Sequence, residues 1–167
     1  MLHHVSVGVA DVERAAKFYD AALRALGYKR IMEFMPYAIA YGETAPEFWV
    51  QLPQNQQPAH AGNGTHVGFT ASSKKAVHKF HETALAQGGK DNGAPGPRPD
   101  YGPEYYGAFV IDLDGNKLEA TYWAEAKPAK AKAAAKSKKK AKAAKKPAKK
   151  ATQKAHKKKA KRKAKRK

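Results

Sequence analysis

Cysteine is absent from this chain, and that absence excludes several kinds of site at once. Without a thiol there is no disulfide, no thiolate-bound zinc and no cysteine nucleophile. Long apolar runs are also missing, because no stretch approaches the roughly 18 apolar residues that a membrane-spanning helix needs. The N-terminus shows no basic segment followed by an apolar run, so we expect no signal peptide and a cytoplasmic protein.

Acidic residues are missing from only one part of the chain. Residues 127–167 contain 22 Lys or Arg and no Asp or Glu, whereas residues 1–126 hold 11 basic and 14 acidic side chains. The net charge of +19 therefore combines a first part at −3 with a strongly cationic tail. A stretch of about 125 residues is long enough for one domain with a buried core. We expect one folded domain over residues 1–126.

The tail, residues 127–167, also lacks aromatic and large aliphatic side chains, so it cannot bury enough apolar surface to fold alone. We expect it to be disordered and to bind DNA or RNA without sequence preference, because its cations neutralise phosphates. Its Lys/Ala/Pro composition resembles the C-terminal tails of linker histones, which implies association with the nucleoid or chromatin. A solubilising extension is the alternative. The candidate nucleic-acid-binding residues are Lys138, Lys139, Lys140, Lys145, Lys146, Lys157, Lys158, Lys159, Arg162 and Arg166.

An internal repeat relates the two halves of residues 1–126. With a shift of 62 residues, His4 aligns with His66 and Phe18 with Phe80. Two copies of so long a unit are typical of a duplicated supersecondary module rather than of a solenoid.

Each copy predicts a strand, a helix and three further strands. Apolar and polar residues alternate with a period of two at the start of each copy. The helices are expected to begin after Asp11 and after Ser72 or Ser73, and to end at glycines. Strands are expected near residues 4–9, 28–34, 37–42, 47–52, 66–71, 90–92, 105–112 and 116–123. The sequence therefore predicts an α+β fold built from two βαβββ modules.

The alternation places four polar side chains away from the predicted helices. If the apolar residues of a strand pack under a helix, the residues between them point to the opposite face of the sheet. His4 and His66 in the first strands take this face. So do Gln51 and Glu119 in the last strands. If the two sheets curl around a shared cleft, these four side chains converge there.

Three motifs together resemble the vicinal oxygen chelate superfamily of glyoxalase I, extradiol dioxygenases and bleomycin-resistance proteins: HHVSVGVADVERAAKFYDAAL, GNGTHVGF and DLDGNKLEA. The resemblance covers residues 2–123 and implies one domain whose two modules share a metal- and ligand-binding cleft. It implies that His4, His66 and Glu119 are metal ligands and that Gln51 occupies the fourth position. A neutral Gln is a poor ligand where the family often has a carboxylate, so hydrogen bonding within the cleft is the alternative role for Gln51.

Two imidazoles and a carboxylate suit Fe, Zn, Ni, Co or Mn and leave positions open for substrate oxygens. The resemblance implies a glyoxalase-like lyase or a dioxygenase that acts on a small molecule chelating a divalent metal through neighbouring oxygens. Glu119 then also serves as the catalytic base. A metal-free protein that binds or sequesters a small molecule is one alternative, because a fold does not determine a function. A nucleoid- or chromatin-associated protein in which the tail carries the function is the other. Homodimers are common in this family, and the two alternatives here are a cleft closed within one chain and a cleft closed across a homodimer.

Five further residues are candidate substrate contacts. Aromatic side chains of the strands and of the Pro/Gly-rich loop at residues 93–104 are expected to line a pocket, and this loop is expected to form its wall. Arg98 in that loop carries a fork of N–H donors suited to an anionic group. Core packing or a dimer contact is the alternative for the aromatic residues, and plain solvent exposure is the alternative for Arg98. The candidates are Trp49, Arg98, Tyr101, Tyr105 and Trp123.

Overall fold

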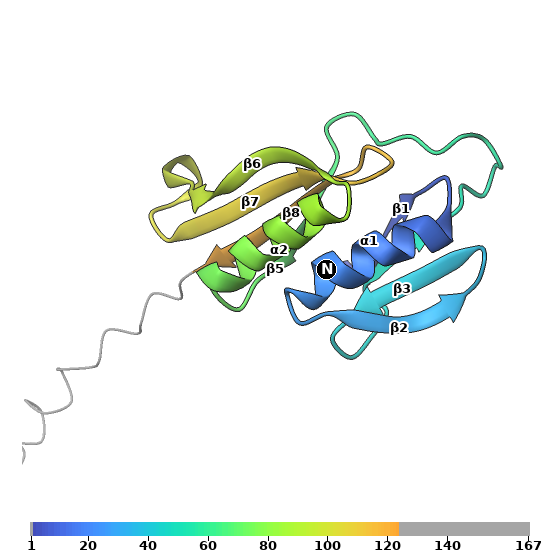
Figure 1. Cartoon of the computed structure of the whole chain (residues 1–167), viewed down its shortest axis with the longest axis horizontal. Coiled ribbons are helices and arrows are strands. Elements are labelled where there is room, and N and C mark those ends of the chain that lie inside the picture. Colours follow the sequence, from blue (N-terminus) through green and yellow to red (C-terminus); the bar gives the residue numbers. More distant parts are fainter. Residues whose placement is uncertain (1, 124–167) are drawn as a thin grey trace, which may run out of the picture. The chain divides into compact units, whose positions relative to one another are not determined.

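A computed structural model describes residues 2–123, which form two modules of one helix and four strands each (Figure 1). The first module comprises β1 (Val5–Gly8), α1 (Val12–Arg24), β2 (Lys29–Phe34), β3 (Ala38–Gly42) and β4 (Phe48–Gln51). The second comprises β5 (His66–Thr70), α2 (Lys74–Ala86), β6 (Lys90–Pro97), the short 3-10 helix η1 (Pro99–Tyr101), β7 (Tyr105–Ile111) and β8 (Lys117–Trp123). The predicted α+β fold with two βαβββ modules is confirmed. The candidate nucleic-acid-binding residues of the tail lie outside the described residues.

Each module forms a mixed four-stranded sheet. The strand orders are β1-β4-β3-β2 and β5-β8-β7-β6. The first strand of each module pairs in parallel with the last, whereas the remaining neighbours are antiparallel. Residues from the beginning and the end of a module therefore lie side by side.

The helix boundaries follow from capping residues. Asp11 accepts a hydrogen bond from the backbone N–H of Arg14 at 2.9 Å, and Ser73 accepts one from Ala76 at 3.2 Å. These contacts satisfy N–H groups that have no partner inside the first turn of a helix. Beyond the helix ends, Gly27 and Gly88 have φ angles of 96° and 92°. The expected N-caps and glycine stops are confirmed, with Ser73 rather than Ser72 capping α2.

The two helices lie next to each other, and each covers one face of its own sheet (Figure 1). A single apolar core contains side chains from both modules. The rings of Phe48 and Phe69, one from each module, meet edge to face with centroids 5.0 Å apart. No helix within residues 2–123 is long and apolar enough to cross a membrane.

β6 is longer than the strand predicted at residues 90–92. The predicted loop at residues 93–104 is in part strand, because β6 continues to Pro97. Since β6 is an edge strand, its prolines need not donate a hydrogen bond to a second neighbour. Its pairing with β7 is irregular around Gly93. The remaining loop contains η1 and ends before Tyr105.

A buried aspartate links the modules. Asp112, only 4% exposed, accepts hydrogen bonds from the Tyr19 hydroxyl of α1 at 2.7 Å and from the Asn116 side chain at 2.9 Å. Asn116 also donates to the carbonyl of Gly8 in β1 at 3.1 Å. Burial, followed by the charge of Asp112, raises the pKa of Tyr19 well above 10, so its hydroxyl stays a donor.

Replacing Tyr19 with Phe tests this link, because Tyr19→Phe removes the hydroxyl and keeps the ring. We expect the free energy of unfolding to fall by about 1.5–3 kcal/mol, as for a hydrogen bond to a charged group. Tyr28→Phe is the matched control, because the partly exposed Tyr28 hydroxyl donates to the neutral carbonyl of Thr70 and should contribute about 1 kcal/mol or less. Urea unfolding at pH 7 measures both values. Equal losses for the two variants would contradict the role given to Asp112.

Candidate functional site

The face of each sheet that points away from its helix is called here the open face. In β8, Leu118 and Ala120 belong to the core, so the alternating Glu119 and Thr121 lie on the open face. Tyr105 from β7 reaches both of them. The parallel pairing of β5 with β8 adds His66 to the same face. These four residues are called the Glu119 cluster.

Glu119 is the buried centre of this cluster, with only 3% of its surface exposed. The Tyr105 hydroxyl donates to its Oε1 at 2.5 Å, and Nε2 of His66 lies 3.4 Å from its Oε2. Gly107 permits this position, because a Cβ at Gly107 would lie only 3.0 Å from Oε1. Half of the His66 side chain remains exposed, at 47%, so one edge of the cluster is open to a ligand.

Tyr105 keeps its proton over a wide range of pH. Burial raises the pKa of Tyr105 above 10, and the hydrogen bond to the Glu119 carboxylate raises it further. The Tyr105 hydroxyl also lies 3.1 Å from Oγ1 of Thr121. The phenol is therefore a donor that orients the carboxylate.

The predicted aromatic candidates of the second module lie beside the cluster. The ring of Tyr105 meets those of Tyr101 and Trp123 edge to face, each at a centroid distance of 5.2 Å. Tyr101 and Trp123 are 60% and 53% exposed. Arg98 lies over the ring of Phe109, which belongs to the strand that neighbours Glu119.

The open face of the first module carries a histidine and aromatic rings. His4 directly precedes β1, is exposed, and has its ring centroid 6.5 Å from that of Trp49. Trp49 stacks on Phe34 at 6.1 Å. Nδ1 of His4 lies 2.9 Å from Nδ1 of the neighbouring His3.

The strand register separates His4 from Gln51. Ser6 pairs with Trp49, and the corresponding residue of the second module, Gly68, pairs with Glu119. Trp49 therefore stands where the repeat places a counterpart of Glu119. Gln51 pairs with Gly8, four residues beyond His4, which is about 13 Å along a strand.

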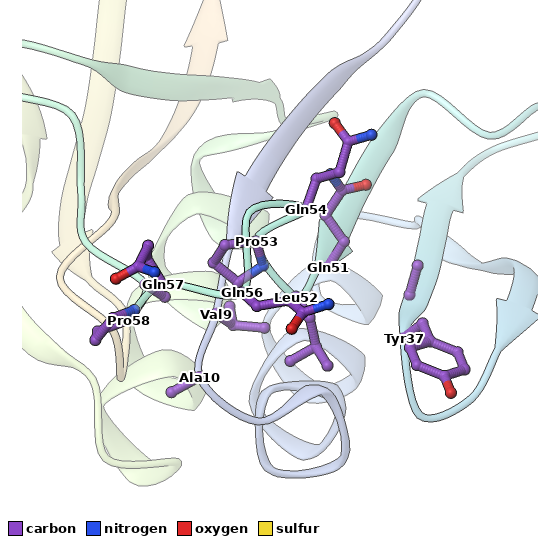
Figure 2. Close-up of a pocket in the computed structure, with 12 residues that line it drawn as sticks. Val9, Ala10, Tyr37, Gln51, Leu52, Pro53, Gln54, Gln56, Gln57 and Pro58 are labelled. Atoms are coloured by element: carbon purple, nitrogen blue, oxygen red, sulfur yellow. The ribbon is translucent and has the colours of Figure 1, made fainter.

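Gln51 instead lines an open pocket of about 860 Å³ (Figure 2). Val9 and Ala10, which directly follow β1, form part of its wall, and Tyr37 of the β2–β3 hairpin lies across from the linker that joins the modules. Every lining residue is uncharged: Val9, Ala10, Tyr37, Ala38, Gln51, Leu52, Pro53, Gln54, Gln56, Gln57, Pro58 and Ala59. The pocket suits a neutral group and offers four side-chain amides.

The family resemblance implies a divalent metal. Whether one chain could bind it depends on the metal-binding side chains of its open faces. Of the four predicted ligands, His66 and Glu119 lie close together, and they are of the types that bind such metals. Within residues 2–123, no group of three His, Asp or Glu is close enough to hold a metal ion. The side chains of one chain are therefore of the right type for a divalent metal, but too few of them lie close together to bind it.

Sequence reasoning missed two residues of the second open face, Phe109 and Lys117. Phe109 pairs directly with Glu119, and Lys117 lies two residues before Glu119 on the same strand. Extending the alternation of β8 by one step, and applying it to β7, would have placed both on this face.

Residues 1–120 match the model of the Glyoxalase/Bleomycin resistance protein/Dioxygenase superfamily. The chain belongs to this superfamily, as the three motifs indicated. A glyoxalase/bleomycin resistance protein from Albidiferax ferrireducens T118 is 36% identical, with 74% of this chain and 99% of that chain covered and a TM-score of 0.67. No curated protein gives a significant match.

Two more distant solved structures support the fold alone. A glyoxalase-related enzyme from Fulvimarina pelagi is 22% identical, covering 73% of this chain and 87% of that one, with a TM-score of 0.58. A lactoylglutathione lyase from Agrobacterium tumefaciens is 18% identical, covering 73% of this chain and 92% of that one, with a TM-score of 0.51.

The pKa of Tyr105 tests the geometry of the Glu119 cluster. In Glu119→Gln, the pKa of Tyr105 should fall toward 10 without reaching it, because the negative charge is lost but the burial remains. Tyrosine ring-carbon shifts, followed by NMR from pH 8 to pH 12, measure this change. Glu104→Gln, an exposed loop control, should leave the titration unchanged. An unaltered pKa of Tyr105 in Glu119→Gln would contradict the contact.

Proposed function

We propose that the protein binds a small molecule on the open face of its second module and carries out glyoxalase- or dioxygenase-like chemistry there. The observation that carries this proposal is the buried Glu119 carboxylate, held by Tyr105 and His66 from two neighbouring strands. A carboxylate is costly to bury, and this one faces away from the apolar core. Buried acidic groups of this kind are typical of sites that bind metals or transfer protons.

Three residues of the cluster have roles in this proposal. Glu119 accepts a proton from a carbon next to a carbonyl group of the substrate. The Tyr105 hydroxyl orients the carboxylate and keeps one of its oxygens in place. His66 presents Nε2 at the open edge, where it binds a substrate oxygen or a metal. A divalent metal, when bound, polarises neighbouring substrate oxygens.

A second copy of the chain is proposed to complete the donor set with its His4. Both open faces carry large exposed hydrophobic side chains, including Phe34 at 52% and Trp123 at 53%. Such exposed apolar surface is typical of a protein–protein contact or a ligand site. Contact between the first open face of one chain and the second open face of another would bring His4 toward His66 and Glu119.

Metal-free binding of a small molecule is the second candidate function. It is supported by the incomplete donor set of one chain and by Trp49 at the position that repeats Glu119. In this case Glu119 and His66 serve as hydrogen-bonding groups for the ligand. Gln51 then acts in the neutral pocket as a hydrogen-bonding side chain rather than as a fourth metal ligand.

Metal content of the untagged full chain distinguishes the two candidates. After incubation with Fe(II), Zn, Ni, Co or Mn, we expect one metal per site in the wild type and little in His4→Ala, His66→Ala or Glu119→Gln. The exposed His60→Ala is the matched control and should retain the metal. A wild-type chain that binds none of these metals would exclude the first candidate.

Mixing two of these variants tests the contribution of the second copy. If His4 and His66 of one site come from different chains, equal amounts of His4→Ala and His66→Ala should recover about a quarter of the sites after exchange of subunits. A mixture that recovers no metal, while the wild type binds it, would place both histidines in the same chain.

The tail is proposed, from its composition alone, to bind nucleic acid without sequence preference and to associate the protein with the nucleoid. If about 6–10 phosphates are neutralised, the affinity for duplex DNA should fall by about 10³–10⁵ between 50 and 200 mM salt. Substituting Lys138, Lys139 and Lys140 with Gln should reduce the slope of this salt dependence. Filter binding measures it, with removal of residues 127–167 as the control. DNA binding that survives this removal would contradict the proposal.

A further inference from the structure

Phe109 on the second open face is flanked by two cations. The Arg98 guanidinium carbon lies 5.5 Å from the Phe109 ring centroid, and Nζ of Lys117 lies 4.8 Å from the same centroid. The ring of His66 meets Phe109 edge to face at 6.4 Å. Phe109 also pairs with Glu119, so these positive charges lie immediately beside the Glu119 cluster.

Arg98 is held in this position by the backbone of β6. Its two terminal nitrogens donate to the carbonyls of Ala94, at 2.8 Å, and Pro97, at 3.2 Å. A Cβ at Gly93 or Gly96 would lie only 3.3 or 3.2 Å from the guanidinium, so these glycines leave the space that it occupies. An arginine has five N–H donors, and the two backbone contacts leave others free for a ligand.

The charges of Arg98 and Lys117 are not neutralised within residues 2–123. Neither side chain forms an ion pair with a described carboxylate. Glu119 is the nearest acidic residue in the strand pairing, and its oxygens already contact Tyr105 and His66. Most other basic side chains of residues 2–123 also lack an ion pair, so what sets Arg98 and Lys117 apart is their position at one aromatic ring beside Glu119.

We propose that Arg98 and Lys117 bind the carboxylate of a small organic acid, and that this acid is the ligand of the second open face. Lys117 is two residues from Glu119, which is about 7 Å along a strand. A carboxylate bound at Lys117 therefore leaves the next few carbons of the same molecule beside Glu119. The partly exposed Tyr105 ring offers an apolar surface to that part of the ligand. This inference rests on the proposed function for the choice of face, but the binding of the anion requires neither a metal nor a second chain.

Benzoate and its neutral analogue benzamide are a matched pair of probes for this site. The full chain is used, and the Phe109 ring resonances are followed by NMR, because the cationic tail also attracts anions. We expect benzoate to bind more tightly than benzamide to the wild type. Arg98→Gln and Lys117→Gln should each weaken benzoate binding about tenfold and leave benzamide unchanged. Arg98→Lys should retain part of the affinity, because the charge stays and the fork of donors is lost.

Lys17→Gln is the control for the loss of one positive charge, because Lys17 is exposed on α1, and it should bind both probes like the wild type. The unfolding midpoint of each variant shows that the fold is retained. Three results would overturn the proposal: no benzoate-dependent shift at Phe109, equal affinities for the two probes, or unchanged benzoate affinity in both Gln variants.

Metal content of the same variants separates this inference from the proposed function. If the wild type binds no metal but binds benzoate through Arg98 and Lys117, the metal-dependent chemistry is excluded and the anion site stands. If metal is bound and benzoate affinity does not depend on these two residues, the anion site is excluded and the metal-dependent chemistry stands.

Discussion

The parallel pairing of the first and last strands is the constraint on which each module depends. It joins residues 43 positions apart in the first module and 51 in the second, and it closes each module into one sheet with one covered face. In the second module this pairing sets Gly68 against Glu119 and brings His66 to the carboxylate. The backbone of β5 lies close to the acid here, because a Cβ at Gly68 would lie 3.6 Å from Oε2 of Glu119, an ordinary van der Waals distance. The candidate site is therefore a direct product of strand register.

The same strand pairing places different side chains on the open faces of the two modules. Where the second module has Glu119, the first has Trp49, and the stacked Trp49 and Phe34 make that open face aromatic rather than acidic. The link between Tyr19 and Asp112 holds the modules together through the core side of the sheets. The open faces are consequently free to differ. The open face of the second module thus carries acidic and basic groups, whereas that of the first carries apolar rings.

The periodicity of the sequence predicted most of the fold, because core residues of β1, β5 and β8 alternate cleanly and the helices carry capping residues. It also placed His66 and Glu119 on one face. The periodicity could not predict how far apart His4 and Gln51 lie. Alternation determines which face of the sheet a side chain takes, but not its position along the partner strand. Lys117 and Phe109 were missed for another reason: the alternation assigns both to this face, but nothing marks a Lys or a Phe as part of a site until its neighbours in space are known.

The prolines of β6 have a consequence for how chains associate. β6 is at the edge of its sheet, and Pro95 and Pro97 have no N–H to offer to a further strand. An edge interrupted in this way resists extension of the sheet into a neighbouring molecule. Self-association by continuous strand pairing is thereby disfavoured at this edge. At this edge, copies of the protein can meet only through side chains, where the identity of each residue determines which partner is accepted.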